Sequence, residues 1–294
     1  MLTIKKYAAI DIGSNAIRLL ISNIIEKPGN PTLFKKNALV RVPIRLGEDV
    51  FLKGEISLKN QQRMLDAMQA FKLLMNAHQV EHYRACATSA MRDAGNGYAF
   101  AKAIKEQTGV QIDIIDGEEE AAIIAKTDLQ SFIKPDRTYL YVDVGGGSTE
   151  LTIYHKGKII ASKSFKIGTV RLLNDLVSQK DWRAFISWIT ENTKKYKHID
   201  LIGSGGNINK VFKLSSKKPG KTLSYLYLSQ LYNELNGMSY EDRILKLSLN
   251  PDRADVIIPA LRIYLQATKY SKAKQIIVPK IGLSDGIIKS LYEK

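Results

Sequence analysis

A strand that ends in aspartate and then turns through glycine occurs twice in this chain, and it constrains the fold more than any other feature. The first copy reads YAAIDIGSNAIRLLIS and places Asp11 at the end of an apolar run. The second copy reads TYLYVDVGGGSTELTIY and places Asp143 in the same position, 132 residues later (143 minus 11). In both copies a second apolar run follows at once, which is typical of a β-hairpin. The repeat predicts two similar halves that face each other across a cleft.

The second hairpin combines residue types that suit phosphate and a metal ion. Gly145, Gly146 and Gly147 can take backbone angles closed to other residues, and they let a ligand approach the main chain closely. Successive N–H groups in such a turn can form an anion-binding nest. The flanking carboxylates of Asp143 and Glu150 suit a hard divalent cation shared with phosphate, usually Mg²⁺. A tight hairpin with ordinary surface acids is the simpler alternative, because glycine turns are common.

A third glycine turn lies in the second half of the chain. The apolar run HIDLIG leads into GSGGNINKVF, which contains Gly205 and Gly206 and opens a helix. Helix N-termini that follow such turns bind phosphate readily, although glycine also occurs there for turn geometry alone.

The remaining pattern alternates strands with helices, which predicts an α/β fold. Residues 33–51 predict a third strand that leads into a loop, and the spacing of apolar residues predicts a helix that begins at Ser57 as N-cap. Gly109 ends a short helix, and three glutamates open another at 117. Residues 251–270 predict one long helix kinked at Pro259. The second half adds strands at 138–144, 149–154 and 158–165, and helices near 169–177 and 181–195.

Composition narrows the functional classes. The 294 residues carry a net charge of +15, which attracts polyanions but does not choose among them, and a solvated basic surface explains it equally well. Cys86 is the single cysteine and predicts a buried thiol, while the four histidines form no zinc motif. No apolar run approaches the roughly 18–20 residues that cross a bilayer, and the first residues run straight into a motif. We therefore expect a soluble cytoplasmic protein with no membrane partner.

Taken in order, the motifs resemble the exopolyphosphatase / guanosine pentaphosphate phosphohydrolase (Ppx/GppA) family. The matching stretches span nearly the whole chain: DIGSNAIRLL (11–20), VPIRLGEDV (42–50), ATSAMRDAGNG (87–97), DGEEEA (116–121), DVGGGSTEL (143–151), GSGGN (203–207), RADVIIPA (253–260) and GLSDGII (282–288). The resemblance implies two actin-like domains, of the superfamily that includes sugar kinases and heat-shock chaperones, at 1–125 and 126–294. The last helix, about 286–294, is expected to pack back on the first domain. A homodimer is compatible with the resemblance, but no stretch identifies an interface.

Site residues follow from the resemblance. Glu120 matches the general base for the attacking water, and Asp143 and Glu150 match acids that bind metal or position water. The residues that match phosphate-binding positions are Asp11, Gly13, Ser14, Asn15, Arg18, Arg92, Asn96, Gly145, Gly146, Gly147, Ser148, Gly205 and Gly206. The implied cofactor is Mg²⁺, with Mn²⁺ as the alternative, and the implied substrates are polyphosphate or guanosine pentaphosphate. Such chemistry needs a positioned water and charge neutralisation on the transferred group.

Three departures from the family pattern concern the substrate. Asn207 replaces the usual threonine after the paired glycines, and Ser284 and Asp285 replace an arginine and a glutamate. The long members also carry a C-terminal helical region with a His-Asp module, whereas this chain stops at Lys294. We therefore expect a preference for short polyphosphate chains, or for a different phosphoanhydride. The Lys-rich stretch 209–221 is either a partial substitute for the missing polyanion channel or a solvated loop.

Other functions stay open at this point. A kinase of the same superfold would share the paired hairpins, although no motif for a hydroxyl substrate is found. A non-catalytic nucleotide or polyphosphate sensor would explain the three departures. We expect no nucleic-acid partner, because the basic residues are not interleaved with aromatic ones.

Overall fold

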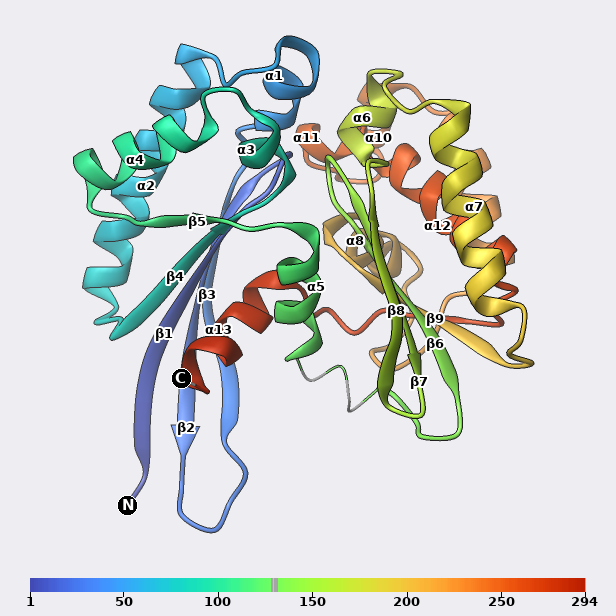
Figure 1. Ribbon diagram of the computed structural model, residues 1–294, viewed down its shortest axis with the longest axis horizontal. Coiled ribbons are helices and arrows are strands. Elements are labelled where there is room, and N and C mark those ends of the chain that lie inside the picture. The colour runs from blue at the N-terminus through green and yellow to red at the C-terminus, as the bar shows by residue number, and fades with distance from the viewer. Residues whose placement is uncertain (128, 130–131, 294) are drawn as a thin grey trace. The chain divides into compact units, whose positions relative to one another are not determined.

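The computed structural model describes residues 1–127, 129 and 132–293. The chain divides into two compact units, which Figure 1 colours from blue to red along the sequence. Unit 1 comprises Met1–Thr127 together with Leu283–Lys294, and unit 2 comprises Asp128–Gly282. Each unit is built on one mixed five-stranded sheet.

The sheet of unit 1 has the strand order β3-β2-β1-β4-β5. Its strands are β1 (Thr3–Ile12), β2 (Ile17–Glu26), β3 (Leu33–Val42), β4 (His82–Ala87) and β5 (Ile112–Ile114). The first three strands form an antiparallel meander, while β4 pairs parallel with β1 and β5 parallel with β4. One face of β1 packs on a buried core through Ala8, Ile10 and Ile12. Because successive side chains of a strand point to opposite faces, Asp11 lies on the other face of the sheet.

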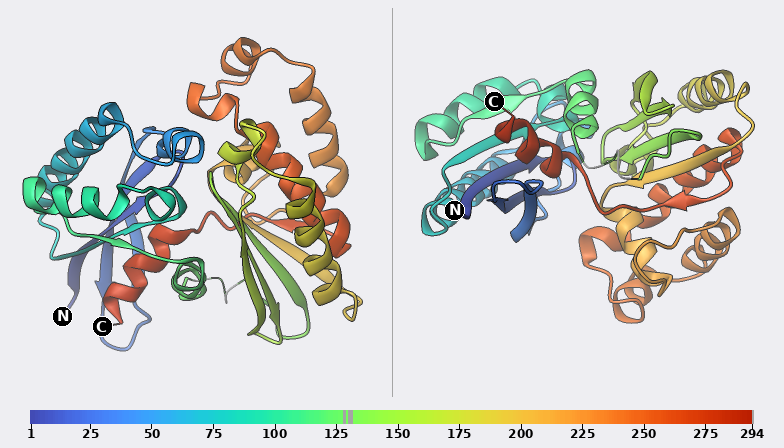
Figure 2. Two further views of the ribbon diagram at one scale, coloured as in Figure 1. Left: turned by 45° about the horizontal axis from the view of Figure 1, so that its top comes forward. Right: turned by 90° about the horizontal axis from the view of Figure 1, so that it is seen from below.

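Six helices of the described chain belong to unit 1. They are α1 (Leu46–Lys53), α2 (Leu58–Ala77), α3 (Ser89–Asp93), α4 (Gly97–Thr108), α5 (Gly117–Ala125) and α13 (Leu283–Tyr292). The core that includes Ile10 is completed by Met68 and Phe71 of α2 and Phe100 of α4. Helix α13 returns from the end of the chain to pack on β1, β4 and α5, as Figures 1 and 2 show.

The sheet of unit 2 repeats the arrangement with the order β10-β9-β6-β7-β8. Its strands are β6 (Thr138–Val144), β7 (Thr149–His155), β8 (Lys158–Phe165), β9 (Ile199–Ser204) and β10 (Ile276–Ile277). Again the first three form an antiparallel meander, and the last two run parallel to the first. The two sheets therefore share one topology, and this confirms the predicted α/β fold with two similar halves.

The helices of unit 2 are arranged around one long central helix, α12. They are α6 (Thr169–Leu173), α7 (Gln179–Thr193), α8 (Gly206–Leu214), α9 (Tyr225–Asn236), α10 (Tyr240–Leu245), α11 (Pro251–Ala254) and α12 (Ile257–Ser271). Helix α12 contacts α6, α7, α8 and α9 and lies against β6, so it contributes to the core beneath the second glycine hairpin.

Two predicted elements are wrong. Residues 46–53 form helix α1 instead of a loop; the helix is short, and its N-cap residue Arg45 makes no side-chain cap, so the sequence carries little helical signal there. Residues 251–270 do not form one kinked helix, because the chain breaks after α11 and restarts at Ile257. Pro259 consequently lies in the first turn of α12, where a missing N–H costs nothing.

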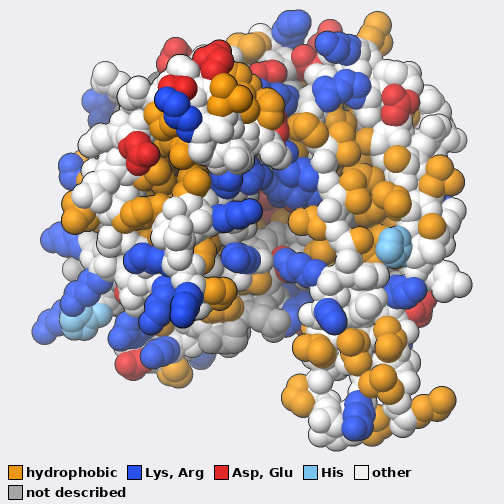
Figure 3. Space-filling view, turned by 180° about the vertical axis from the view of Figure 1, so that it is seen from behind, with side chains coloured by type: hydrophobic (Ala, Val, Ile, Leu, Met, Phe, Trp, Pro, Cys, Tyr) orange, Lys and Arg blue, Asp and Glu red, His pale blue; other side chains and the backbone are white. Residues whose placement is uncertain are grey.

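Several local predictions are confirmed. Ser57 accepts a hydrogen bond from the N–H of Asn60 and caps α2, and Gly109 ends α4 with a φ of 72°. Cys86 is buried. In the described part of the chain, no helix combines the length and the apolar character that spanning a membrane requires. Figure 3 shows lysine and arginine side chains spread among hydrophobic and uncharged ones, with acidic side chains less frequent, in keeping with the net charge of +15.

Candidate functional site

The two glycine hairpins have the same backbone geometry. The N–H of Gly145 donates to the carbonyl of Ser148 over 3.0 Å, and the N–H of Gly13 donates to the carbonyl of Ala16 over 3.2 Å. A Cβ added to Gly145 would lie 3.2 Å from the Ser148 carbonyl oxygen, and one added to Gly13 would lie 3.3 Å from that of Ala16. Each loop is therefore too tight for a larger residue at its first glycine to fit without adjustment.

In unit 2 the start of α6 holds the glycine loop from behind. The N–H groups of Thr169 and Val170 donate to the carbonyls of Gly145 and Gly146 over 3.0 and 2.8 Å. The Arg171 Nε donates to the carbonyl of Gly147 over 2.9 Å. These bonds also satisfy N–H groups that the first turn of a helix leaves without an intrahelical partner.

The same bonds set the direction of the loop's own N–H groups. In a planar trans peptide, the N–H points opposite to the carbonyl of the preceding residue. The carbonyls of Gly145, Gly146 and Gly147 point toward α6 and its first residues, so the N–H groups of Gly146, Gly147 and Ser148 point away from it. Three successive N–H groups with a common direction are the arrangement that binds an anion.

Gly168, which belongs to none of the sequence motifs, packs directly against this loop. A Cβ on Gly168 would lie 2.3 Å from the carbonyl oxygen of Gly146 and 2.4 Å from the carbonyl carbon of Gly147. Its φ of −130° is open to any residue, so the requirement for glycine comes from this contact alone. The requirement for glycine at 168 therefore comes from a tertiary contact, and no local pattern in the sequence predicts it.

Asp143 and Glu150 lie side by side next to the loop. They are direct partners in the antiparallel ladder of β6 and β7, so their side chains share one face of the sheet. Glu150 is buried, and its Oε1 accepts hydrogen bonds from Ser148 Oγ over 2.6 Å and Ser164 Oγ over 3.0 Å. Asp143 is half-buried, and its Oδ2 accepts from Ser204 Oγ over 3.2 Å. Two adjacent carboxylates thus sit among hydroxyl groups.

The glycine turn before α8 packs against the end of β6. Gly205 has a φ of 110°, and a Cβ there would lie 3.0 Å from the Val144 carbonyl oxygen and 3.4 Å from Asp143 Oδ1. Gly206 opens α8 immediately afterwards. Burial raises the pKa of both Tyr141 and Tyr264 well above the usual value, and the charge of Asp143 adds to the rise in pKa. Both phenols therefore stay protonated beside this carboxylate.

The corresponding row of unit 1 has a different charge pattern. Asp11 is the counterpart of Asp143, but its partner across the ladder is Arg18 instead of a glutamate. Arg18 Nη1 lies 2.8 Å from Asp11 Oδ2, and Asp11 is 6% exposed. Arg41 is the next partner along the row, on β3. The acid of unit 1 thus pairs with an arginine of its own sheet, whereas the ladder partner of Asp143 in unit 2 is a second acid, Glu150.

The loop of unit 1 is held by α1 as the loop of unit 2 is held by α6. The N–H of Gly47 donates to the carbonyl of Ser14 over 2.8 Å, and the N–H of Arg45 donates to that of Asn15 over 3.2 Å. Ser14 is buried, and its hydroxyl lies 3.0 Å from that of Ser89. Helix α1, which was not predicted from the sequence, and its N-cap residue therefore hold the main chain of Ser14 and Asn15 in place.

Glu120 differs from its neighbours in the first turn of α5. The Asp116 side chain accepts from the N–H of Glu119 over 2.8 Å and caps the helix. Glu118 and Glu119 are exposed, and Glu119 forms a salt bridge of 2.7 Å with Arg84. Glu120 is only 8% exposed. Glu118 and Glu119 are therefore ordinary solvated glutamates, whereas Glu120 is not.

Arg92 and Asn96 have contacts that hold main chain in place. Arg92 Nη1 donates to the carbonyl of Ile115 over 2.7 Å, just before the cap of α5. The Asn96 amide pairs with Ile56 in both directions, since it accepts from the N–H and donates to the carbonyl, both over 2.9 Å. Arg92 therefore supports the start of the helix that carries Glu120, and Asn96 joins two loops of unit 1.

The residues at the second hairpin fit the Mg²⁺ that the resemblance implies. Mg²⁺ is usually bound through one or two carboxylates, with waters and substrate phosphates completing its octahedron. Asp143 and Glu150 supply two adjacent carboxylates, and the neighbouring donors are hydroxyl oxygens. Within the described residues no group of three or more His, Cys, Asp or Glu side chains could hold a metal. Any ion at this position would therefore depend on phosphate oxygens as well.

Several known proteins are similar to this chain. Exopolyphosphatase 2 of Mycobacterium tuberculosis is 25% identical over 99% of both chains. A bifunctional 3-dehydroquinate synthase/phosphatase of Fusobacterium nucleatum is 30% identical over 97% of the chain, which spans 46% of that protein. The guanosine-5'-triphosphate,3'-diphosphate pyrophosphatase of Photobacterium profundum is 34% identical over 57% of the chain, and this matched part corresponds to 32% of that protein.

Solved structures give the same result for the fold. The Ppx/GppA family member of Aquifex aeolicus is 25% identical and superposes with a TM-score of 0.77 over 99% of this chain and 98% of its own. An exopolyphosphatase of Cytophaga hutchinsonii, 23% identical, reaches a TM-score of 0.84 over 98% of both chains. The profile of the Ppx/GppA phosphatase family matches residues 33–294, and we conclude that this chain belongs to that family.

Proposed function

We propose that this protein hydrolyses the terminal phosphoanhydride bond of inorganic polyphosphate, with Mg²⁺ as cofactor and Mn²⁺ as the alternative. One observation carries the proposal: α6 turns the N–H groups of Gly146, Gly147 and Ser148 in one direction beside the paired carboxylates of Asp143 and Glu150. A phosphate cradle beside two acids is what phosphoryl transfer to water requires.

The residues divide the work as follows. The loop N–H groups bind the oxygens of the terminal phosphoryl group, and the hydrogen bonds from Ser148 and Ser164 hold the Glu150 carboxylate in one orientation. Glu120 accepts a proton from the attacking water, a contribution typically worth about 10²–10⁴-fold in rate. Asp143 and Glu150 would hold the metal ion, which, when bound, neutralises charge on the transferred group.

The extent of similarity favours polyphosphate over guanosine pentaphosphate. The mycobacterial exopolyphosphatase matches this chain end to end, whereas the guanosine pyrophosphatase of Photobacterium matches 57% of it, and that match spans 32% of the pyrophosphatase. Guanosine pentaphosphate hydrolysis remains the second candidate, because that partial match is higher in identity, at 34%. Within polyphosphate, we propose a preference for short chains.

Phosphate release provides the test of hydrolysis. We expect release from polyphosphate with Mg²⁺ or Mn²⁺, and a loss of about 10²–10⁴-fold in Glu120→Gln. Glu118→Gln is the matched control, because it removes a charge from the same helical turn at an exposed position and should keep the wild-type rate. If the wild type releases no phosphate, or if Glu120→Gln is as active as Glu118→Gln, the proposal is wrong. Competition between polyphosphate and guanosine pentaphosphate ranks the two substrates.

Metal binding can be measured without turnover. We expect Mn²⁺ titrated into the protein with a non-hydrolysable phosphate analogue to give a bound electron paramagnetic resonance signal. Glu150→Gln should weaken this binding, because it removes one of the two adjacent carboxylates while keeping the side chain's size. Glu191→Gln removes a carboxylate of the same unit at an exposed position on α7 and should leave the Mn²⁺ affinity unchanged. Equal affinities for the wild type and Glu150→Gln would contradict the assignment of the metal.

A further inference from the structure

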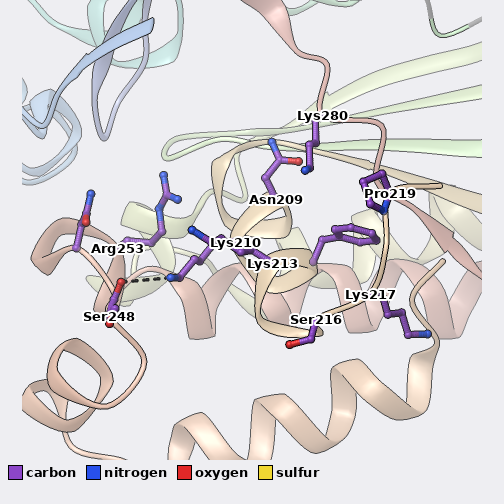
Figure 4. A pocket seen from close by; sticks show the side chains of 11 residues that line it. Asn209, Lys210, Lys213, Ser216, Lys217, Pro219, Ser248, Arg253 and Lys280 are labelled. Atoms are coloured by element: carbon purple, nitrogen blue, oxygen red, sulfur yellow. Dashed lines mark hydrogen bonds between the residues drawn. The ribbon is translucent and has the colours of Figure 1, made fainter. Parts of the chain in front are cut away.

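A cavity of about 570 Å³ lies in unit 2 on the side of α8. It is lined by the stretch 209–219, by residues of the 248–253 segment and by Lys280 (Figure 4). The Lys-rich stretch that the sequence left as either a polyanion contact or a solvated loop therefore forms one wall of a concave surface. Its cations are Lys210, Lys213, Lys217, Arg253 and Lys280.

The charge of the cavity is entirely positive. Among the described residues that line it, five are cationic and none is acidic. Lys210 shows the effect of this crowding: burial lowers its pKa, and the charges of Lys213 and Arg253 lower it further. Like charges held around one hollow repel one another, so an anion that enters it gains more than it would at a scattered basic surface.

Two of the cations are held by main-chain oxygens, which fixes the shape of the wall. Lys210 Nζ donates to the carbonyls of Leu247 and Ser248 over 3.3 and 3.2 Å, and Figure 4 shows its bond to Ser248. Lys217 Nζ donates to the carbonyl of Thr222 over 2.8 Å. Lys280 Nζ lies 5.9 Å from the centre of the Phe212 ring, which also lines the cavity. The cavity is therefore built from residues with defined positions.

Helix α8 links this cavity to the glycine turn beside Asp143. Helix α8 begins at Gly206, directly after Gly205, whose added Cβ would lie 3.4 Å from Asp143 Oδ1. Lys210 and Lys213 follow Gly206 by four and seven residues, which at 1.5 Å per residue places them about 6 and 10 Å along the helix axis. One helix thus connects the proposed catalytic acid with the cationic wall, all within unit 2.

We propose that this cavity binds a run of phosphoryl groups, the distal part of the same chain whose terminal phosphate the Gly145–Ser148 loop holds. The inference rests on the proposed hydrolysis, and it adds a determinant of chain length. Affinity should rise with the number of phosphates until the chain fills the cavity, and should then level off. A short chain that fills the cavity should therefore bind as tightly as a much longer one.

A ladder of polyphosphate lengths, beginning at tripolyphosphate, tests the proposal. We compare wild type, Lys213→Gln, the double variant Lys213→Gln/Lys280→Gln, and the control Lys197→Gln, which removes an exposed charge of the same unit outside the cavity. Each charge removed from the cavity should lower kcat/KM for long chains by about two- to fivefold more than for tripolyphosphate. The effect should lie in KM and shrink at high salt, because these charges are exposed to solvent.

Equilibrium binding separates a failure of this inference from a failure of the hydrolase proposal. Calorimetry with wild type and the double variant, using polyphosphate and guanosine tetraphosphate in separate arms, needs no turnover. Weaker binding of long chains by the double variant supports the cavity even if no phosphate is released. The inference is overturned if the variants bind and hydrolyse all lengths as Lys197→Gln does, or lose equally on tripolyphosphate and long chains. A loss confined to guanosine tetraphosphate would also overturn it and assign the cavity to a nucleotide.

Discussion

Gly168→Ala is the sharpest test of the glycine loop, because it changes one methyl group at a residue with no chemistry of its own. The added Cβ would lie 2.3 Å from the Gly146 carbonyl oxygen and 2.4 Å from the Gly147 carbonyl carbon, whereas ordinary contact begins near 3.4 Å. The obstruction is main chain and cannot rotate away. Either the loop or the start of α6 must therefore move by about 1 Å, since such close contacts are not tolerated in a packed interior.

This displacement should lower both the stability of the protein and the rate of phosphate release. Overpacking of this kind typically costs about 1–3 kcal/mol of stability, which for a unit of this size lowers Tm by about 2–12 °C. Misplacement of a binding group by about 1 Å can cost about 10²-fold in rate. Movement of α6 instead of the loop would break the bonds from Thr169 and Val170, so both routes disturb the N–H groups. We expect the rate to fall by about 10²-fold in a protein that remains folded.

Phosphate release at saturating polyphosphate, together with thermal unfolding, measures the two effects. Gly237→Ala is the control, because Gly237 also belongs to unit 2, has a φ of −77°, and has its nearest Cβ contact at 3.5 Å. A Gly168→Ala protein that remains folded and keeps a rate close to that of Gly237→Ala would refute the reasoning. Such a result would mean that turnover does not depend on the position of the loop or on the direction of its N–H groups.

Three further outcomes are expected. Gly286→Ala should destabilise unit 1 by about 1–3 kcal/mol in thermal unfolding, because the added Cβ would lie 2.2 Å from the carbonyl oxygen of Ile123 in α5. This loss is expected even though alanine favours helices more than glycine does. Gly205→Ala should lower both Tm and the rate of phosphate release, since it combines a φ of 110° with a Cβ 3.0 Å from the Val144 carbonyl oxygen. Burial raises the pKa of Cys86 to about 12, so the folded thiol should stay protonated and react with a thiol reagent at pH 9 far more slowly than the denatured chain; equal rates would contradict this.

The sequence predicts best where local pattern and burial agree. Both hairpins could be located because alternating apolar residues end at Asp11 and Asp143 and resume after a glycine turn. The cap at Ser57 and the stop at Gly109 are local chemistry of the same kind. Helix α1 escaped prediction because it is eight residues long and begins after Arg45 in the left-handed region, with no side-chain cap.

The supports of the candidate site could not be predicted, because they are contacts between distant residues. Nothing near Gly168 in the sequence shows that its Cα packs against the 146–147 peptide, and nothing near Asn96 shows that its amide pairs with Ile56. The choice of Glu120 among three glutamates rested on the family resemblance. Its burial beside two exposed neighbours supplies an independent physical reason for that choice.

The duplicated sheets also explain why only one hairpin is assigned a metal. Residues 132 positions apart are equivalent in the two ladders, so Arg18 stands where Glu150 stands in unit 2. An arginine beside Asp11 cancels the charge that a cation would need, and it leaves a guanidinium that suits a phosphate oxygen. A glutamate beside Asp143 doubles the negative charge, which two carboxylates tolerate best with a cation between them. A single exchange at one ladder position would therefore leave both loops able to bind phosphate and confine the proposed metal ion to unit 2.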